Sequence, residues 1–214
     1  MEQVLTYLDQ NKERYLAELK ELLAIPSVST NPDNKGDVQR CAGWIADHMT
    51  NIGLQNVKVM PTPGHPVVYG DWLNAPGKPT VLLYGHYDVQ PPEPLELWTS
   101  PPFEATIRGE NLYARGSADD KGQVYIHLKS IEAYMKNVGS LPVNIKLLIE
   151  GEEEIGSEHL VPFVTEHKEM LKADLVLISD SSMFAKGVPS ICYALRGLAY
   201  MQIDLVGPNK DLHS

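Results

Sequence analysis

Apolar residues at helical spacing open the chain. From Val4 to Leu23 they recur every three or four positions, which predicts an amphipathic helical segment. Pro26 ends this segment, because the residue before a proline is biased away from the helical conformation. The same spacing predicts a second helix from about Asp37 to Ile52, and Gly53 follows as its stop.

The pattern then changes to short continuous apolar runs that are rich in β-branched residues. Three such runs, Thr80–Tyr84, Val143–Ile149 and Asp174–Ser179, are typical of buried strands. Helical patterns near Gly122–Lys136 and Glu158–Leu171 lie between them. This alternation of strand and helix predicts an α/β domain with a largely parallel sheet.

The end of the chain has a different character. Ser190–Ala194 and Leu198–Val206 have the pattern of two strands, with a turn near Arg196-Gly197. We therefore expect residues 1–187 to form the N-terminal part of one domain. Residues 188–214 would be the truncated beginning of a second.

Composition narrows the class of protein. The 214 residues are 43% hydrophobic and 21% charged, as in ordinary globular proteins. The net charge of −10 disfavours nucleic acid as a partner. Two cysteines, Cys41 and Cys192, do not make a disulfide framework. No signal peptide or membrane span is predicted, so we expect a cytoplasmic protein without a membrane partner.

Polar segments follow each of the three predicted strands. Gly85–Asp88 follows the first, Glu150–Glu154 the second and Ser179-Asp180 the third, while Arg115–Gly122 precedes a predicted helix. In open α/β sheets, ligands bind at the edge formed by the carboxyl ends of the strands. One imidazole and several carboxylates are therefore expected to meet there.

This set of side chains suits a metal site. Zinc binds His nitrogen and carboxylate oxygen, and carboxylates can bridge two metals. A further carboxylate can accept a proton from bound water. The residues that supply these parts are His86, Asp119, Glu153, Glu154 and Asp180.

Each part also has a purely structural explanation. Asp119-Asp120 can cap a helix N-terminus, and Asp180 can be a turn residue. Glu152–Glu154 can be a solvated charge run, and His86 an ordinary hydrogen-bonded residue. The residues alone leave the metal site and these structural roles as open alternatives.

Several segments together resemble a known family. They are Gly85–Pro91, Trp98–Phe103, Leu112–Gly122, Glu150–Glu158, Ile178–Asp180 and Asn209–Ser214. In these segments the sequence resembles the M20 family of zinc metallopeptidases, most closely its cytosolic and carnosine-type dipeptidases. The resemblance implies a three-layer α/β catalytic domain of the zinc-exopeptidase type. It also implies the start of a smaller α+β lid domain through which such proteins form homodimers.

The resemblance implies a role for each metal ligand. His86, Asp119 and Asp180 would bind one zinc ion, and Asp119 would also bridge to a second. Glu154 would bind that second ion. Manganese is an alternative to zinc.

Three further residues would serve the reaction directly. Glu153 would be the general base for a water between the two metals, and Asp88 would orient His86. His213 of the smaller domain would reach the neighbouring active site across the dimer. The implied reaction is metal-dependent hydrolysis of the amide bond in dipeptides or short peptides. The alternatives are a deacylase or desuccinylase of N-acyl amino acids, or a non-catalytic fragment that retains the fold.

The sequence departs from the family at its end. The family uses a further histidine and the rest of the smaller domain, which would follow Ser214. We therefore expect either a fragment or a second polypeptide that supplies the missing C-terminal half. The isolated chain is expected to lack part of the site and full activity.

Overall fold

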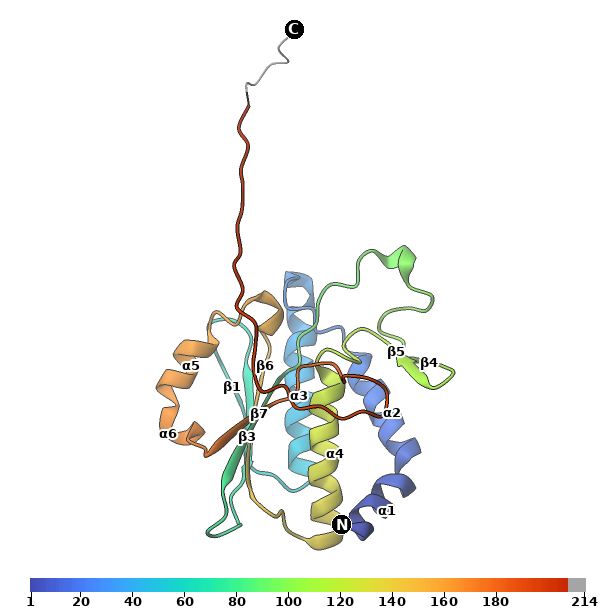
Figure 1. Ribbon diagram of the computed structural model, residues 1–214, viewed down its shortest axis with the longest axis vertical. Helices are drawn as coiled ribbons and strands as arrows, with labels where there is room; N and C mark the ends of the chain where they lie inside the picture. The colour runs from blue at the N-terminus through green and yellow to red at the C-terminus, as the bar shows by residue number, and fades with distance from the viewer. Residues whose placement is uncertain (208–214) are drawn as a thin grey trace. The chain divides into compact units, whose positions relative to one another are not determined.

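The computed structural model describes residues 1–207, and the chain divides into two units, Met1–Ser181 and Ser182–Ser214. A five-stranded sheet forms the centre of the first unit (Figure 1). In spatial order its strands are β1 (Gln55–Met60), β2 (Val67–Trp72), β6 (Asn144–Glu150), β3 (Thr80–His86) and β7 (Leu175–Ile178).

The sheet is mixed but mainly parallel. β3 pairs in parallel with both β6 and β7, whereas β2 pairs antiparallel with β1 and β6. Four of the five strands therefore share one direction, and β2 alone runs against them. The predicted α/β fold with a mainly parallel sheet is confirmed.

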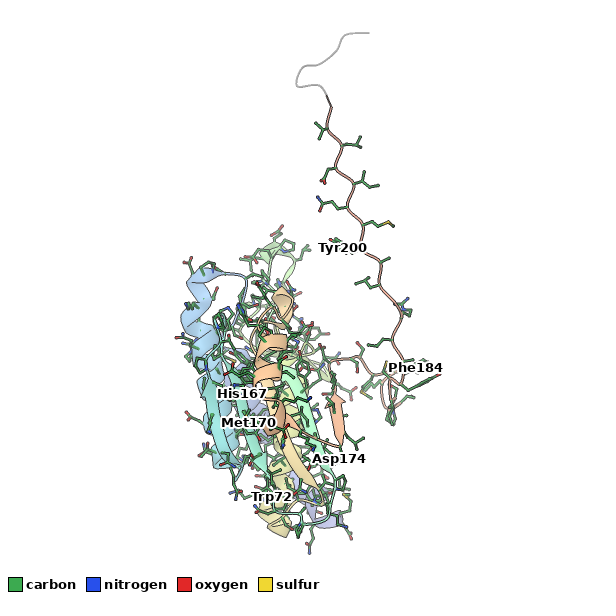
Figure 2. The ribbon with its side chains drawn as sticks, turned by 90° about the vertical axis from the view of Figure 1, so that its left-hand side faces the viewer. Trp72, His167, Met170, Asp174, Phe184 and Tyr200 are labelled. Atoms are coloured by element: carbon green, nitrogen blue, oxygen red, sulfur yellow. The ribbon has the colours of Figure 1, made fainter. Side chains whose placement is uncertain are left out.

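Helices cover both faces of the sheet, which gives three layers (Figure 1). On one face, α3 (Lys35–Asn51) and α4 (Lys121–Val138) contact the strands, and α1 (Glu2–Gln10) and α2 (Lys12–Leu23) pack against α4. On the other face lie α5 (Leu160–Glu166) and α6 (Lys168–Leu171), which face the viewer in Figure 2. A small hairpin of β4 (Thr106–Arg108) and β5 (Asn111–Tyr113) precedes α4.

The larger core lies between the sheet and α3 and α4. One face of α3 buries Val38, Cys41, Ala42, Ile45 and Met49, all of them fully shielded from solvent. Cys41, Ile45 and Met49 belong to the apolar stripe that predicted a helix from Asp37 to Ile52. The core on the α5–α6 face is smaller.

The N-terminal and C-terminal helical patterns each form two helices instead of one. Asn11 interrupts the first, where its side-chain amide donates to the carbonyl of Tyr7 at 2.8 Å. His167 separates α5 from α6. At Asn11, a polar side chain that bonds to a nearby carbonyl competes with the helical hydrogen bonds.

The second unit contains neither of the two strands expected near its end. Ser182–Gly207 has one isolated bridge, between Ala185 and Val188, and no strand at Ser190–Ala194 or Leu198–Val206. A lone pair of strands is marginal without further packing. The division at residue 187 stays a prediction. Within residues 1–207, no helix is long and apolar enough to cross a membrane.

Candidate metal centre

His86 is the last residue of β3, and its side chain is completely buried. Its Nδ1 lies 3.1 Å from the backbone oxygen of Asp88 and 3.4 Å from the Asp88 carboxylate. Because both of these neighbours are oxygen acceptors, Nδ1 carries the ring hydrogen and Nε2 points to the site. Asp88 thus orients the ring through its carbonyl at least as closely as through its side chain.

Three carboxylates face the other ring nitrogen of His86, Nε2. Nε2 lies 3.1 Å from Asp119 Oδ1, 3.6 Å from Asp180 Oδ2 and 3.9 Å from Glu153 Oε2. The ligand atoms of His86, Asp119 and Asp180 all lie within 4.8 Å of one another. The structure therefore brings together the three residues that were predicted to bind the first metal.

The charges around His86 favour the binding of a cation. Burial lowers the pKa of His86, but the hydrogen bond and charge of Asp88, with Asp120 and Glu153, outweigh it and raise the pKa to about 10. Burial also raises the pKa of the Glu153 carboxyl, as does the charge of Glu154, although His86 opposes them. A divalent ion would relieve this repulsion among carboxylates, so the donor set fits a metal.

Asp120 behaves differently from its neighbour Asp119. Asp120 occupies the N-cap position of α4 but makes no side-chain capping bond. Its Oδ2 instead accepts the backbone N–H of His86 at 3.1 Å. Its buried Oδ1 has no hydrogen-bond partner in the described part of the chain. Burial raises the pKa of this carboxyl to about 7, with His86 opposing and the charges of Asp180 and Asp119 contributing.

Glu153 and Glu154 stand on a short 3-10 turn, Glu153–Ile155, just after β6. The Asp88 carboxylate accepts the backbone N–H of Glu153 at 3.2 Å and that of Glu154 at 3.1 Å. Gln90 Nε2 donates to Glu154 Oε2 at 2.6 Å. Glu154 is not part of the group around His86, and burial followed by the charge of Asp119 raises its pKa despite the bond from Gln90.

The sequence profile of peptidase family M20/M25/M40 matches residues 82–199, which is more than half of the chain. The chain belongs to this family. His86, Asp119, Asp180 and the Glu153-Glu154 pair all fall within the matched range.

Relatives of this M20 chain include named dipeptidases. The Cys-Gly metallodipeptidase DUG1 of Candida albicans is 37% identical over 97% of this chain and 46% of its own length. The human Beta-Ala-His dipeptidase is 32% identical over 100% of this chain and 45% of its own length. The chain thus spans about half the length of the curated relatives that it matches.

A solved structure supports the same relationship. The crystal structure of human carnosine dipeptidase 1 superposes with a TM-score of 0.79 and 33% identity. The match covers 84% of this M20 chain and 41% of that structure. The observed three-layer architecture is therefore that of an M20 catalytic domain.

One predicted site residue cannot be placed. His213 lies outside the described residues, which end at Gly207. The remaining predicted residues of this M20 chain, from His86 to Asp180, all belong to the first unit. Their catalytic roles stay predictions.

Sequence reasoning did not assign several residues that support the site. The Glu152–Glu154 run is not simply solvated, because Glu152 is buried. Its Oε1 accepts the N–H of His65 at 3.0 Å, and its Oε2 lies 2.8 Å from His159 Nδ1. These side chains occur within or near the matched motifs, but only the folded chain shows which groups they contact.

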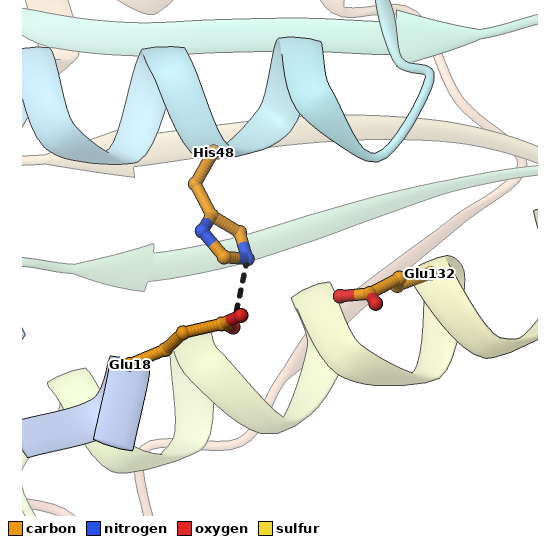
Figure 3. A group of neighbouring side chains, drawn as sticks. All are labelled: Glu18, His48 and Glu132. Carbon is orange, nitrogen blue, oxygen red and sulfur yellow. Dashed lines mark ion pairs between the residues drawn. The ribbon is translucent and has the colours of Figure 1, made fainter. Parts of the chain in front are cut away.

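A second group of possible metal ligands lies between α2, α3 and α4 (Figure 3). Glu18, His48 and Glu132 also have ligand atoms within 4.8 Å of one another. The ammonium of Lys129 donates to Glu18, to His48 Nε2 at 2.6 Å and to Glu132 at 2.8 Å. Arg14 also pairs with both carboxylates, at 2.6 Å in the case of Glu18. Two internal cations therefore already neutralise this group, and we assign no metal to it.

Proposed function

We propose that this chain supplies the metal ligands and the general base of a metallopeptidase that hydrolyses dipeptides or short peptides. The observation that carries the proposal is the convergence of His86, Asp119 and Asp180 within 4.8 Å at the carboxyl edge of the sheet. The dipeptidase names of the relatives support this reaction class. Because the chain spans only about half of those relatives, the activity is proposed for the complete protein.

His86, Asp119 and Asp180 would hold one metal, and Asp119 with Glu154 would contribute to a second. We propose zinc, with manganese as the alternative, since imidazole and carboxylate ligands suit both. When bound, the metal pair polarises the substrate carbonyl and lowers the pKa of a bound water.

Glu153 would move the proton in this reaction. Its carboxylate lies 3.9 Å from His86 Nε2, and the backbone bond to Asp88 holds its position. Because burial raises the pKa of Glu153, it accepts a proton from water more readily than an exposed glutamate does. The same group would then deliver that proton to the leaving amine.

The remaining predicted features belong to the complete protein. Cys-Gly and β-Ala-His are the dipeptides named by the relatives, and both are substrates to test first. A homodimer through the smaller domain would bring His213 to the neighbouring site. The cytoplasmic location likewise stays a prediction.

Zinc content tests the metal assignment. We expect purified chain 1–214 to hold about one zinc ion, because three of its own side chains form a ligand set with an open position for water. His86→Ala should lose that zinc, whereas the matched control His167→Ala should keep it. Elemental mass spectrometry of dialysed protein measures the ratio, and the absence of zinc from the wild type after zinc loading would overturn the assignment.

Turnover tests the base. In a protein that includes the remaining half of the fold, we expect Glu153→Gln to lower kcat by about 10²–10⁴-fold, the usual contribution of a general base. Metal content should not change. Glu158→Gln is the control, because Glu158 is exposed in the same segment. Near-normal hydrolysis by Glu153→Gln would contradict the assignment.

A further inference from the structure

Lys121 is a completely buried lysine at the start of α4, directly after Asp119-Asp120. Its ammonium donates to the carbonyl of Ile25 at 2.7 Å and to that of Leu22 at 3.3 Å. Leu22 belongs to the last turn of α2 and Ile25 lies two residues beyond its end, where the helix dipole favours a cation. Each carbonyl also accepts a backbone N–H, that of Ile25 at 3.3 Å and that of Ser27 at 2.9 Å. Lys121 therefore joins the start of one helix to the end of another.

The segment that Lys121 holds is itself bonded to the site. Ser27 Oγ donates to the carbonyl of Tyr87 at 2.6 Å, and the N–H of Val89 donates to the carbonyl of Ser27 at 3.0 Å. A parallel bridge also joins Val28 to Val89. Tyr87 and Val89 flank Asp88. The Ser27-Val28 segment that follows α2 is therefore bonded to the residues that follow His86.

The turn that carries Asp119 is wound closely around the stem of Lys121. Gly116 has φ +80°, and a Cβ there would lie 2.8 Å from Val89 and 3.2 Å from Lys121 Cδ. The N–H of Gly122 closes the turn onto the carbonyl of Gly116 at 3.2 Å. A displacement of Lys121 would therefore displace this turn and Asp119 with it.

From these contacts we infer that Lys121 is a positioning residue for the metal site. Its ammonium ties the turn bearing Asp119 to the Ile25–Val28 segment, which is bonded to the segment that follows His86. Lys121 thus connects the segments that carry His86 and Asp119. Asp120 connects the same two segments a second time, because its carboxylate accepts the backbone N–H of His86. The inference rests on the proposed function, because it takes His86, Asp119 and Asp180 as metal ligands.

The chain offers a matched control at Lys146. Lys146 is also buried, and its ammonium also donates to two backbone carbonyls, those of Met170 at 2.6 Å and Lys172 at 2.7 Å. It pairs with Leu82 in the sheet, four residues before the pairing of His86 with Glu150. That distance is roughly 13 Å along the strand. Lys146→Met therefore removes the same kind of contact far from the ligands.

The test compares Lys121→Met, Lys146→Met and the wild type of chain 1–214. Zinc affinity is measured by competition with a chromophoric chelator, and stability by urea unfolding in the absence of metal. We expect both variants to be less stable than the wild type. Only Lys121→Met should bind zinc more weakly, by about 10–100-fold, as when a residue that supports a metal ligand is removed.

Two results would overturn the inference: an unchanged zinc affinity in Lys121→Met, or an equal loss in both lysine variants. If the wild type binds no zinc, the proposed function fails first and the inference fails with it. The wild-type measurement therefore distinguishes the two failures.

A second variant keeps the test decisive if Lys121→Met does not fold. Ser27→Ala breaks the bond to the Tyr87 carbonyl without burying or removing a charge. We expect its zinc affinity to fall in the same direction by a smaller factor. Ser130→Ala, which removes an exposed hydroxyl bond to Ile126, should leave the affinity unchanged. Equal zinc affinities in these two serine variants would overturn the inference.

Discussion

The pKa of His48 on α3 depends on charged side chains from two neighbouring helices, α2 and α4. It stacks on Trp44 with ring centroids 4.7 Å apart, and its Nε2 lies 2.6 Å from the ammonium of Lys129. The dashed line in Figure 3 marks its 4.0 Å contact with Glu18. Burial and then the charge of Lys129 lower the pKa of His48 to about 4. His48 is therefore neutral in the folded protein at neutral pH.

We expect this cluster to make the fold sensitive to acid. His48 takes up a proton near pH 6.5 in the unfolded chain but only near pH 4 in the folded one, so stability falls as the pH drops through that interval. The loss is on the order of 2–3 kcal/mol for a shift of this size. Urea unfolding at pH 7, 5.5 and 4.5 measures it.

His48→Gln separates this contribution from those of other groups. The variant should be less stable than the wild type at pH 7, yet lose less stability between pH 6.5 and 4. Glu18, whose pKa the bonds from Lys129 and Arg14 lower to about 2 against its burial, adds a further loss below about pH 4.5 in both proteins. Identical pH profiles above pH 4.5 would show that His48 does not titrate as described.

Gly85 of β3 lies against the start of α4 without room for a side chain. A Cβ at this position would lie 2.6 Å from Asp120 Oδ2 and 2.6 Å from Val124 Cγ2. We expect Gly85→Ala to cost about 1–3 kcal/mol of unfolding free energy, because such overpacking forces backbone shifts. Zinc affinity should fall too, since Asp120 contacts the N–H of His86.

Gly43→Ala is the control for this prediction. Gly43 lies in α3, and a Cβ there would meet no neighbouring atom within 4 Å. Because alanine favours the helix more than glycine does, the substitution should stabilise the protein by up to about 1 kcal/mol. Urea unfolding of both variants gives the comparison. A Gly85→Ala protein as stable as the wild type would show that the helix moves away without cost.

At the scale of single residues, the sequence predicted the types of group at the site and not their contacts. His86 and Asp180 were indicated by their positions after apolar runs, and Asp119 by its position in a polar segment before a predicted helix. The bonds from Gln90 to Glu154 and from Lys121 to Ile25 join segments far apart in the sequence. Nothing in local periodicity encodes such pairings.

Among the elements, β7 is one of the two edge strands of the sheet, and β1 is the other. All four residues of Leu175–Ile178 are exposed, and they pair with β3 on one side only. Groups on an unpaired apolar edge can bond to another chain. We expect the purified chain to self-associate through this strand as its concentration rises.

Val176→Lys tests that expectation. The charge should reduce self-association without destabilising the fold, because Val176 is 61% exposed. Sedimentation velocity over a range of concentrations measures the change. Val161→Lys on α5, at a residue that is 73% exposed, is the control and should leave association as in the wild type. Equal effects of both lysines would assign association to net charge.

The predicted elements were right where the hydrophobic pattern was strong. An apolar run or stripe coincides with each of five correctly predicted elements: β3, β6, β7, α3 and α4. β1 and β2 were not predicted, and each failure has a physical reason. β1 is largely exposed and has no apolar run, whereas β2 buries the polar residue Asp71, which Asn56 and Tyr69 satisfy by hydrogen bonds.

For the molecule as a whole, motifs were more informative than periodicity. The resemblance to M20 peptidases led to the correct family and architecture, because its segments coincide with the ends of β3, β6 and β7. The pattern near Ser190–Val206 led to two strands that the structure does not contain. Alternation alone indicates that a segment is suited to a sheet, whereas pairing requires a partner strand.

Every residue from Ser182 to Gly207 is exposed, which makes the chain suitable for limited proteolysis. Phe184 and Tyr200, labelled in Figure 2, are 82% and 90% exposed, and Tyr193 is 95% exposed. Chymotrypsin, which cuts after aromatic residues, should therefore trim these sites before any in the first unit. Cleavage after Phe184 would leave Asp180 four residues from the new carboxyl end. A trimmed product, identified by its intact mass, should retain the zinc of the uncut chain. Such a product would be a minimal metal-binding core for crystallisation.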